Sequence, residues 1–170
     1  MAHLSSKIAI AIALVAIAGC AKKPPATLPP VAEGTGGSQT PTPTPSAGYL
    51  PGSQQDFVAN TQGDTIYFDT DKYDVDGQDR VILDSQAAWL RAHPNNRVTI
   101  EGHCDERGTR DYNIALGARR ANAAKDYLSS AGVDVSRIST ISYGKERPVA
   151  LGSDESAWQQ NRRAVTLTVQ

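Results

Sequence analysis

The sequence has few cysteines, no excess of charge of either sign and no long apolar run. Its 170 residues include two cysteines, too few for a zinc ribbon or a disulfide scaffold. Seventeen lysines and arginines face eighteen aspartates and glutamates, and the absence of a basic excess argues against general nucleic-acid binding. No apolar stretch reaches the ~18 residues that a spanning helix needs, so a polytopic membrane protein is excluded.

The composition changes sharply along the chain. Eight of the ten prolines lie between Pro24 and Pro51, and nearly all the charge follows Asp56. This distribution predicts three parts: an apolar head at 1–19, a tether at 20–55 and a mixed-charge globular domain at 56–170.

The head is typical of an export signal. Lys7 precedes an apolar stretch at 8–18, which is too short to span a bilayer. The run Ile17-Ala18-Gly19-Cys20 resembles the bacterial lipobox. That resemblance implies cleavage before Cys20, lipidation of its sulfur and acylation of the new amino terminus, with palmitate as the expected acyl chain. Two or three acyl chains anchor a protein stably where one does not. The alternative is an ordinary cleavable signal in which Cys20 is incidental.

The segment after Cys20 is rich in Pro, Thr, Gly, Ser and Ala. Such a composition cannot bury enough apolar surface to offset its ordering entropy, so disorder is expected at 21–52. Ala21 directly after the lipidated cysteine implies delivery to the outer membrane in lipoproteins of this kind, with the globular domain in the periplasm.

The globular part alternates between strand and helix patterns, which predicts an α/β sandwich of the α+β type. The fold expected is a small mixed sheet with two main helices on one face. The expected elements are a strand at 66–68, a helix from 76–79 to about 92, a strand at 98–102, a helix at 112–131 closed by Gly132, and strands at 138–143 and 164–169.

One arginine falls on the core-facing side of the long helix. At ~100° per residue, Arg120 lies amid a stripe of apolar residues that runs from Leu116 to Ala131. A buried arginine is costly unless it is compensated. Two interpretations stay open: Arg120 pairs with an internal acid or extends its head to the rim, or it lines a cleft for an anionic ligand.

The loop 102–109 lies between a strand and the long helix, where α/β folds often place their sites. It supplies carboxylates, a cation and a flexible glycine, and it contains Cys104. With Cys20 lipidated, Cys104 is a lone thiol in an oxidising compartment, so we expect it to be buried and inert.

The sequence supports neither a catalytic site nor a calcium site. No Gly-x-Ser-x-Gly elbow and no pair of carboxylates facing each other across a cleft is evident, so catalysis is not expected. Aligning Gly77 with the glycine of an EF-hand loop puts Lys72 at the first ligand position and Leu83 where a glutamate is required. The sequence therefore predicts neither a metal site nor a cofactor, and the clustered acids are expected to form a solvated face. These acids are Asp69, Asp71, Asp74, Asp76, Asp79 and Asp84.

Several motifs in order resemble the OmpA-like domain. They are Tyr67-Phe68-Asp69, the loop 102–109, Tyr112-Asn113, Leu116 to Ala121, Ser142 to Glu146, and Asn161 to Val165. The resemblance implies a βαβαββ fold that binds peptidoglycan non-covalently, chiefly through the diaminopimelate of the stem peptide. It implies no enzyme activity. A purely structural envelope lipoprotein, or much less plausibly an enzyme acting on peptidoglycan, is the alternative.

The resemblance also assigns roles to residues. Asp105 and Arg120 match the pair that holds diaminopimelate, which suits a ligand carrying both an ammonium and carboxylates. Four more positions match the pocket lining: Asp69, Tyr112, Asn113 and Leu116. Asn161 and Arg163 are expected to brace the pocket or contact glycan. The family also binds TolB within the Tol-Pal system, which acts in envelope integrity and in constriction at cell division, and Glu106 and Arg107 are the candidates for that surface.

Overall fold

The computed structural model describes residues 48–169. The export signal, Cys20 and the tether up to residue 47 therefore lie outside the described residues. The elements are α1 (Gln54–Ala59), β1 (Thr65–Tyr67), α2 (Gly77–Ala92), β2 (Arg97–His103), α3 (Arg110–Ser130), η1 (Val135–Arg137), β3 (Ile138–Gly144), α4 (Glu155–Asn161) and β4 (Arg163–Val169).

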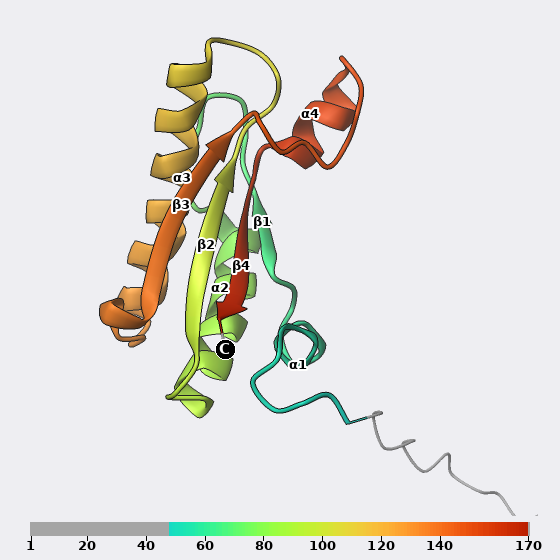
Figure 1. Cartoon of the computed structure of the whole chain (residues 1–170). Helices are drawn as coiled ribbons and strands as arrows, with labels where there is room; N and C mark the ends of the chain where they lie inside the picture. The colour runs from blue at the N-terminus through green and yellow to red at the C-terminus, as the bar shows by residue number, and fades with distance from the viewer. Residues whose placement is uncertain (1–47, 170) are drawn as a thin grey trace, which may run out of the picture. The chain divides into compact units, whose positions relative to one another are not determined.

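The four strands form one mixed sheet in the order β1-β4-β2-β3 (Figure 1). β2 and β3 run parallel, whereas β4 is antiparallel to both β1 and β2. Helices α2 and α3 cover one face, and the opposite face is turned toward the viewer in Figure 1. The predicted fold, a small mixed sheet with two main helices on one face, is confirmed. Three short elements were not predicted: α1, which crosses the expected boundary at residue 56, η1 and α4.

The two long helices begin at side-chain caps. Asp76 accepts a hydrogen bond from the N–H of Asp79, and Thr109 accepts one from the N–H of Tyr112. Their apolar faces meet the sheet in one core. That core includes Phe57, Ile66, Phe68, Leu83, Trp89, Leu90, Val98, Ile100, Leu128 and Ile138.

Two glycines bring α3 unusually close to β2. A Cβ on Gly102 would lie 1.9 Å from the carbonyl oxygen of Gly117, so no larger residue fits at position 102 without moving backbone. This contact fixes the first half of α3 against the end of β2. It therefore sets the position of the loop 104–109, which joins the two elements.

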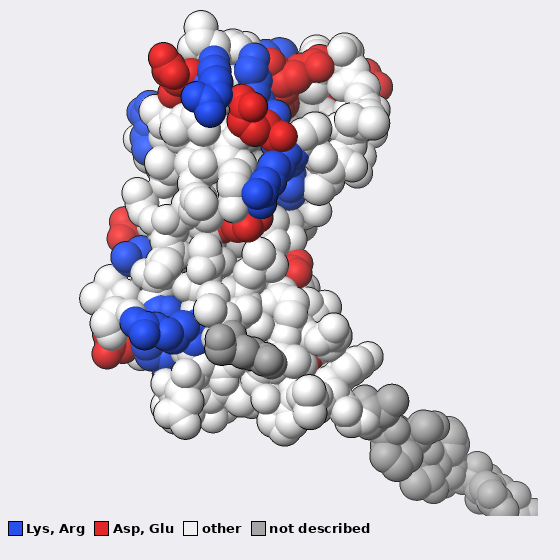
Figure 2. All heavy atoms as spheres, viewed as in Figure 1, with Lys and Arg blue, Asp and Glu red and all other residues white. Residues whose placement is uncertain are grey.

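The short helix α4 begins at the capping residue Asp154, whose side chain accepts from the N–H of Ala157. It lies at the end of the sheet where β2 and β3 finish (Figure 1). Basic and acidic side chains gather and alternate at this end of the visible face, and a separate basic cluster lies at its lower left (Figure 2). Within residues 48–169, no helix is both long and apolar enough to cross a membrane.

Candidate functional site

A cavity of about 290 Å³ opens at this charged end, and we call it the Asp105 cavity. Its walls come from the segment after β1, the loop between β2 and α3, and the first half of α3. The lining residues are Thr70, Asp71, Cys104, Asp105, Arg107, Gly108, Tyr112, Asn113, Leu116 and Arg120. Of the eight predicted ligand residues, the structure brings five together here: Asp105, Tyr112, Asn113, Leu116 and Arg120.

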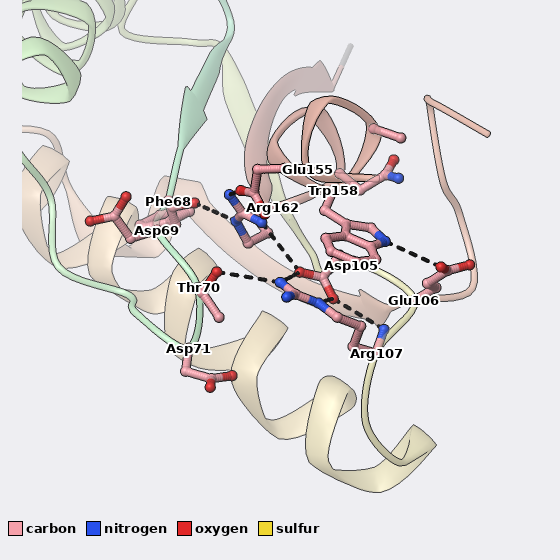
Figure 3. A network of polar contacts seen from close by, with 12 residues as sticks. Phe68, Asp69, Thr70, Asp71, Asp105, Glu106, Arg107, Glu155, Trp158 and Arg162 are labelled. Carbon is pink, nitrogen blue, oxygen red and sulfur yellow. Dashed lines mark hydrogen bonds and ion pairs between the residues drawn. The ribbon is translucent and has the colours of Figure 1, made fainter. Parts of the chain in front are cut away.

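Asp105 is held by two guanidinium groups (Figure 3). Arg107 donates from Nε to Oδ1 at 3.1 Å and from Nη2 to Oδ2 at 2.6 Å, and its backbone N–H donates to Oδ1 as well. Arg162 reaches Oδ2 at 3.5 Å. Burial by itself would raise the pKa of the Asp105 carboxyl, but the hydrogen bonds and charge of Arg107, together with Arg162, outweigh it and the pKa lies below its ordinary value. Asp105 is therefore an anion at neutral pH.

Arg107 is more exposed than the carboxylate that it binds. Its side chain is 39% exposed, whereas that of Asp105 is 9% exposed. The guanidinium carbon lies 4.1 Å from the ring centre of Trp158 in α4, and Nη2 also donates to Thr70 Oγ1 at 3.3 Å. Arg107 thus connects the cavity to α4 and can move without breaking the core.

Arg162 is a buried residue that links Asp105 to the neighbouring elements. Its Nε donates to the carbonyl of Phe68 at 3.0 Å and its Nη2 to Glu155 Oε1 at 2.6 Å, in addition to the contact with Asp105. The side chain is 5% exposed. It therefore joins the end of β1, the start of α4 and the site carboxylate through one rigid group.

Arg120 has no exposed surface, and its three hydrogen bonds go to backbone carbonyls rather than to an acid. Nε donates to Lys72 O at 2.8 Å, Nη1 to His103 O at 2.8 Å and Nη2 to Asp69 O at 3.0 Å. The interpretations that it pairs with an internal acid or extends to the rim are therefore wrong. Burial lowers the pKa of Arg120, but a guanidinium stays protonated, so a positive charge that makes no ion pair among residues 48–169 lies at the back wall of the cavity.

Hydrogen bonds fix two more of the lining side chains. Asn113 is buried and donates from Nδ2 to the carbonyls of Arg107 and Thr109, which holds the loop against α3. The Tyr112 hydroxyl donates to Asp71 Oδ1 at 3.1 Å, and Asp71 has a left-handed backbone with φ of 57°. Cys104 is buried as expected, and burial raises the pKa of its thiol.

Three predicted ligand residues lie elsewhere. The Asp69 side chain is 74% exposed, pairs with Lys72 and points away from Asp105 (Figure 3). Asn161 Oδ1 accepts from the N–H groups of Val149 and Ala150, so it fixes that loop and does not line the Asp105 cavity. Arg163 donates to the carbonyls of Asn161 and Arg147 outside the cavity. Direct contact between these three residues and a ligand in the Asp105 cavity is not supported.

Glu106 and Arg107, the two candidates for TolB binding, lie in different surroundings. Glu106 is exposed, lies outside the Asp105 cavity and accepts a hydrogen bond from Trp158 Nε1 at 3.1 Å. Arg107, by contrast, belongs to the cavity itself.

The sequence reasoning missed Thr70, Asp71 and Arg162. Arg162 ends α4 as its C-cap and directly precedes β4, so no helix or strand repeat in the sequence marks it. No sequence signal marks Thr70 or Asp71, which reach the cavity through the path of a loop.

The site combines groups of both charges, as the binding of a zwitterion would require. Asp105 offers a carboxylate to an ammonium, while Arg107 and Arg120 supply positive charge for carboxylates. Among residues 48–169, no three His, Cys, Asp or Glu side chains are arranged to hold a metal ion.

Comparison with known proteins places the chain in a family. Residues 67–162 match the OmpA family. The chain is 54% identical to the peptidoglycan-associated lipoprotein of Rhizobium meliloti over 161 residues, covering 93% of this chain and 86% of that protein. It is 50% identical to the protein of the same name from Agrobacterium fabrum over 167 residues, covering 98% and 89%.

A solved structure with the same fold points the same way. The crystal structure of the peptidoglycan-associated lipoprotein from Burkholderia pseudomallei superposes with a TM-score of 0.62 at 43% identity, covering 66% of this chain and 93% of that one. The chain therefore belongs to the OmpA family and, within it, to the peptidoglycan-associated lipoproteins.

Proposed function

We propose that this protein is an outer-membrane lipoprotein that binds peptidoglycan non-covalently through the diaminopimelate of the stem peptide. It thereby tethers the outer membrane to the cell wall. The names of its relatives support peptidoglycan as the ligand. The observation that carries the proposal is the Asp105 cavity, where one ionised carboxylate lies among guanidinium groups.

In this proposal Asp105 accepts hydrogen bonds from the diaminopimelate ammonium. Arg107 leaves its present contact with Asp105 and grips a carboxylate of the ligand with two parallel N–H groups. Arg120 is fully buried and donates to three carbonyls, so in this proposal it acts on the ligand through its positive charge. Tyr112, Asn113 and Leu116 shape the walls.

Binding rather than catalysis fits the electrostatics. A carboxyl that acts as a general acid needs a raised pKa, and the pKa of Asp105 is lowered. The alternative of a purely structural role gains support for Arg120 alone, because its hydrogen bonds hold three backbone segments together. A structural role for Arg120 is compatible with ligand binding, because Arg120 also borders the cavity.

The expected affinity is modest. Charge-assisted hydrogen bonds contribute ~1.5–3 kcal/mol each, and binding costs several kcal/mol of lost freedom, so one stem peptide should bind in the range of roughly millimolar to micromolar. A lipid anchor at Cys20 would keep many copies beside a polymeric wall. Such multivalency converts weak contacts into firm attachment.

We further propose that the protein acts in the Tol-Pal system and binds TolB through the exposed surface around Glu106 and Trp158. Glu106 is fixed by the Trp158 indole, and Trp158 packs on Arg107 of the cavity. A partner seated on this surface would therefore touch the group that closes over Asp105. Loss of TolB binding in Glu106→Lys, with sacculus binding retained, tests this assignment.

Co-sedimentation with purified sacculi tests the ligand assignment in a soluble chain that starts at residue 21. Asp105→Asn and Arg107→Gln should each reduce the bound fraction at least about tenfold, since each removes one charge-assisted contact. Asp126→Asn on the exposed side of α3 makes the same chemical change away from the cavity and should bind normally. Free diaminopimelate should compete. Full binding by both cavity variants, with circular dichroism showing them folded, would refute the assignment.

A further inference from the structure

A second cavity lies across the segment 68–72 from the Asp105 cavity, and we call it the Asp79 cavity. Its volume is about 240 Å³. Thr70 and Asp71 face the first cavity, whereas Phe68, Asp69 and Lys72 face the second, so the segment is a shared wall. The full lining is Tyr67, Phe68, Asp69, Lys72, Asp74, Asp76, Gln78, Asp79, Ile82 and Gln159.

The lining carries four acids and one base. Lys72 Nζ lies 2.9 Å from Asp69 Oδ2, so these two charges compensate each other. The carboxylates of Asp74, Asp76 and Asp79 have no lysine, arginine or histidine within 4.0 Å among residues 48–169. The cavity therefore presents three carboxyl groups that no basic side chain among residues 48–169 pairs with.

Asp79 is the most buried of these acids, with 4% of its surface exposed. Its Oδ1 accepts a hydrogen bond from the N–H of Tyr67 at 3.2 Å, but its Oδ2 is buried without any partner. Burial, aided by the charge of Asp76, raises the pKa of this carboxyl despite the hydrogen bond from Tyr67. A buried carboxylate oxygen without a donor is costly, and a donor supplied from outside would remove that cost.

We propose that the Asp79 cavity docks a basic side chain, lysine or arginine, from a protein partner. Both side chains carry several N–H donors and no acceptor, which matches a lining of acceptor carboxylates and the amide of Gln159. Tyr67 lines the same cavity, is 47% exposed and is a residue type that attracts cations.

Other ligands fit the lining less well. The acids are not arranged as metal ligands, since no group of three suitable side chains among residues 48–169 could hold an ion. A zwitterion such as diaminopimelate would bring carboxylates to a surface whose one base, Lys72, is already paired. The site thus selects a plain cation, in contrast to the Asp105 cavity, and does not depend on wall binding.

Amide NMR titration of the soluble chain from residue 21 tests this proposal. The probes are acetyl-Gly-Lys-Gly-amide and acetyl-Gly-Arg-Gly-amide, with acetyl-Gly-Gln-Gly-amide, free diaminopimelate and KCl at equal ionic strength as controls. The two basic peptides should give saturable shifts at Tyr67, Asp79 and Gln159, and should bind at least about fivefold more tightly than the Gln peptide.

Variants separate the docking site from general attraction. Asp79→Asn and Asp74→Asn should each weaken the basic peptides about fivefold, while Asp126→Asn and Asp105→Asn should leave them unchanged. Asp74 is exposed and makes no hydrogen bond or ion pair in residues 48–169, so its variant reports on binding even if Asp79→Asn fails to fold. Equal shifts with KCl or the Gln peptide, stronger binding of diaminopimelate at these amides, or no effect of Asp74→Asn would each overturn the proposal.

Discussion

Replacing Arg120 by lysine tests the most unusual feature of the structure, a fully buried cation that binds three backbone carbonyls. The guanidinium spans Lys72 O, His103 O and Asp69 O with planar N–H groups at 2.8–3.0 Å. An ammonium is a compact, strongly hydrated group and cannot reach all three carbonyls from one point. The substitution keeps the charge and removes the geometry.

The expected loss follows from the hydrogen bonds. Hydrogen bonds to charged groups contribute ~1.5–3 kcal/mol each, so losing two of three should lower the free energy of unfolding by about 3–6 kcal/mol. A typical domain has only about 5–15 kcal/mol in total. With a urea m-value of about 2 kcal/mol/M, the unfolding midpoint should fall by roughly 2 M.

Urea unfolding followed by circular dichroism measures this change, and Arg119→Lys is the matched control. Arg119 is the exposed neighbour of Arg120 on the same helix, and its contact is with the ring of Tyr73 at 5.7 Å. It should change stability by less than about 0.5 kcal/mol. If Arg120→Lys were as stable as Arg119→Lys, the three carbonyl contacts would not stabilise the fold, and the structural role assigned to Arg120 would be wrong.

Three further substitutions or treatments probe other parts of the fold. Burial, with the charges of Arg163 and Arg147, lowers the pKa of His103 to about 4, so below pH 6.5 the unfolded chain binds a proton that the folded chain refuses. Stability should therefore fall by roughly 3 kcal/mol between about pH 6.5 and 4, and His103→Phe should remove that part of the slope in urea titrations; an unchanged slope would contradict the assignment. Gly102→Ala places a Cβ 1.9 Å from Gly117 O and should cost more than ~4 kcal/mol, whereas Gly77→Ala, with no atom within 4 Å, should fold normally. The Cys104 thiol should react with a disulfide reagent at least about a hundredfold more slowly in buffer than in urea, because it is buried and its pKa is raised; equal rates would show that it is accessible.

The helical repeat predicted that the Arg120 side chain is buried, but it did not predict the groups that Arg120 contacts. The 3.6-residue repeat placed Arg120 on the buried side of α3, and its side chain is buried there. It could not reveal the partners, because two of the three carbonyls belong to residues 48 and 51 positions earlier in the chain. Backbone groups of a distant loop leave no pattern in the sequence.

The site walls show the same limit. The family resemblance assigns Asp69 to the pocket lining, but the chain turns after it and brings Thr70 and Asp71 to the cavity instead. That turn uses a left-handed aspartate, which side-chain type alone does not predict. Arg162 ends α4 and contacts Asp105, whereas Arg163 begins β4 and donates to the carbonyls of Asn161 and Arg147. A family motif that names both does not say which one faces the site.

The two cavities differ in charge balance but share a wall, and this allows a double dissociation. The Asp105 cavity sets two acids against two guanidinium groups, whereas the Asp79 cavity has an acidic excess. Asp105→Asn should therefore lose sacculus binding and keep the basic peptides, and Asp74→Asn should do the reverse.

Arg120 holds the shared wall through the carbonyls of Asp69 and Lys72, so Arg120→Lys should weaken both ligands under conditions where the chain remains folded. The measurements are sacculus co-sedimentation and peptide titration on one preparation of each variant. An Arg120→Lys protein that lost one ligand and bound the other with full affinity would show that the wall is not held in common. Arg120 would then have to act on the affected cavity by its own contacts rather than through segment 68–72.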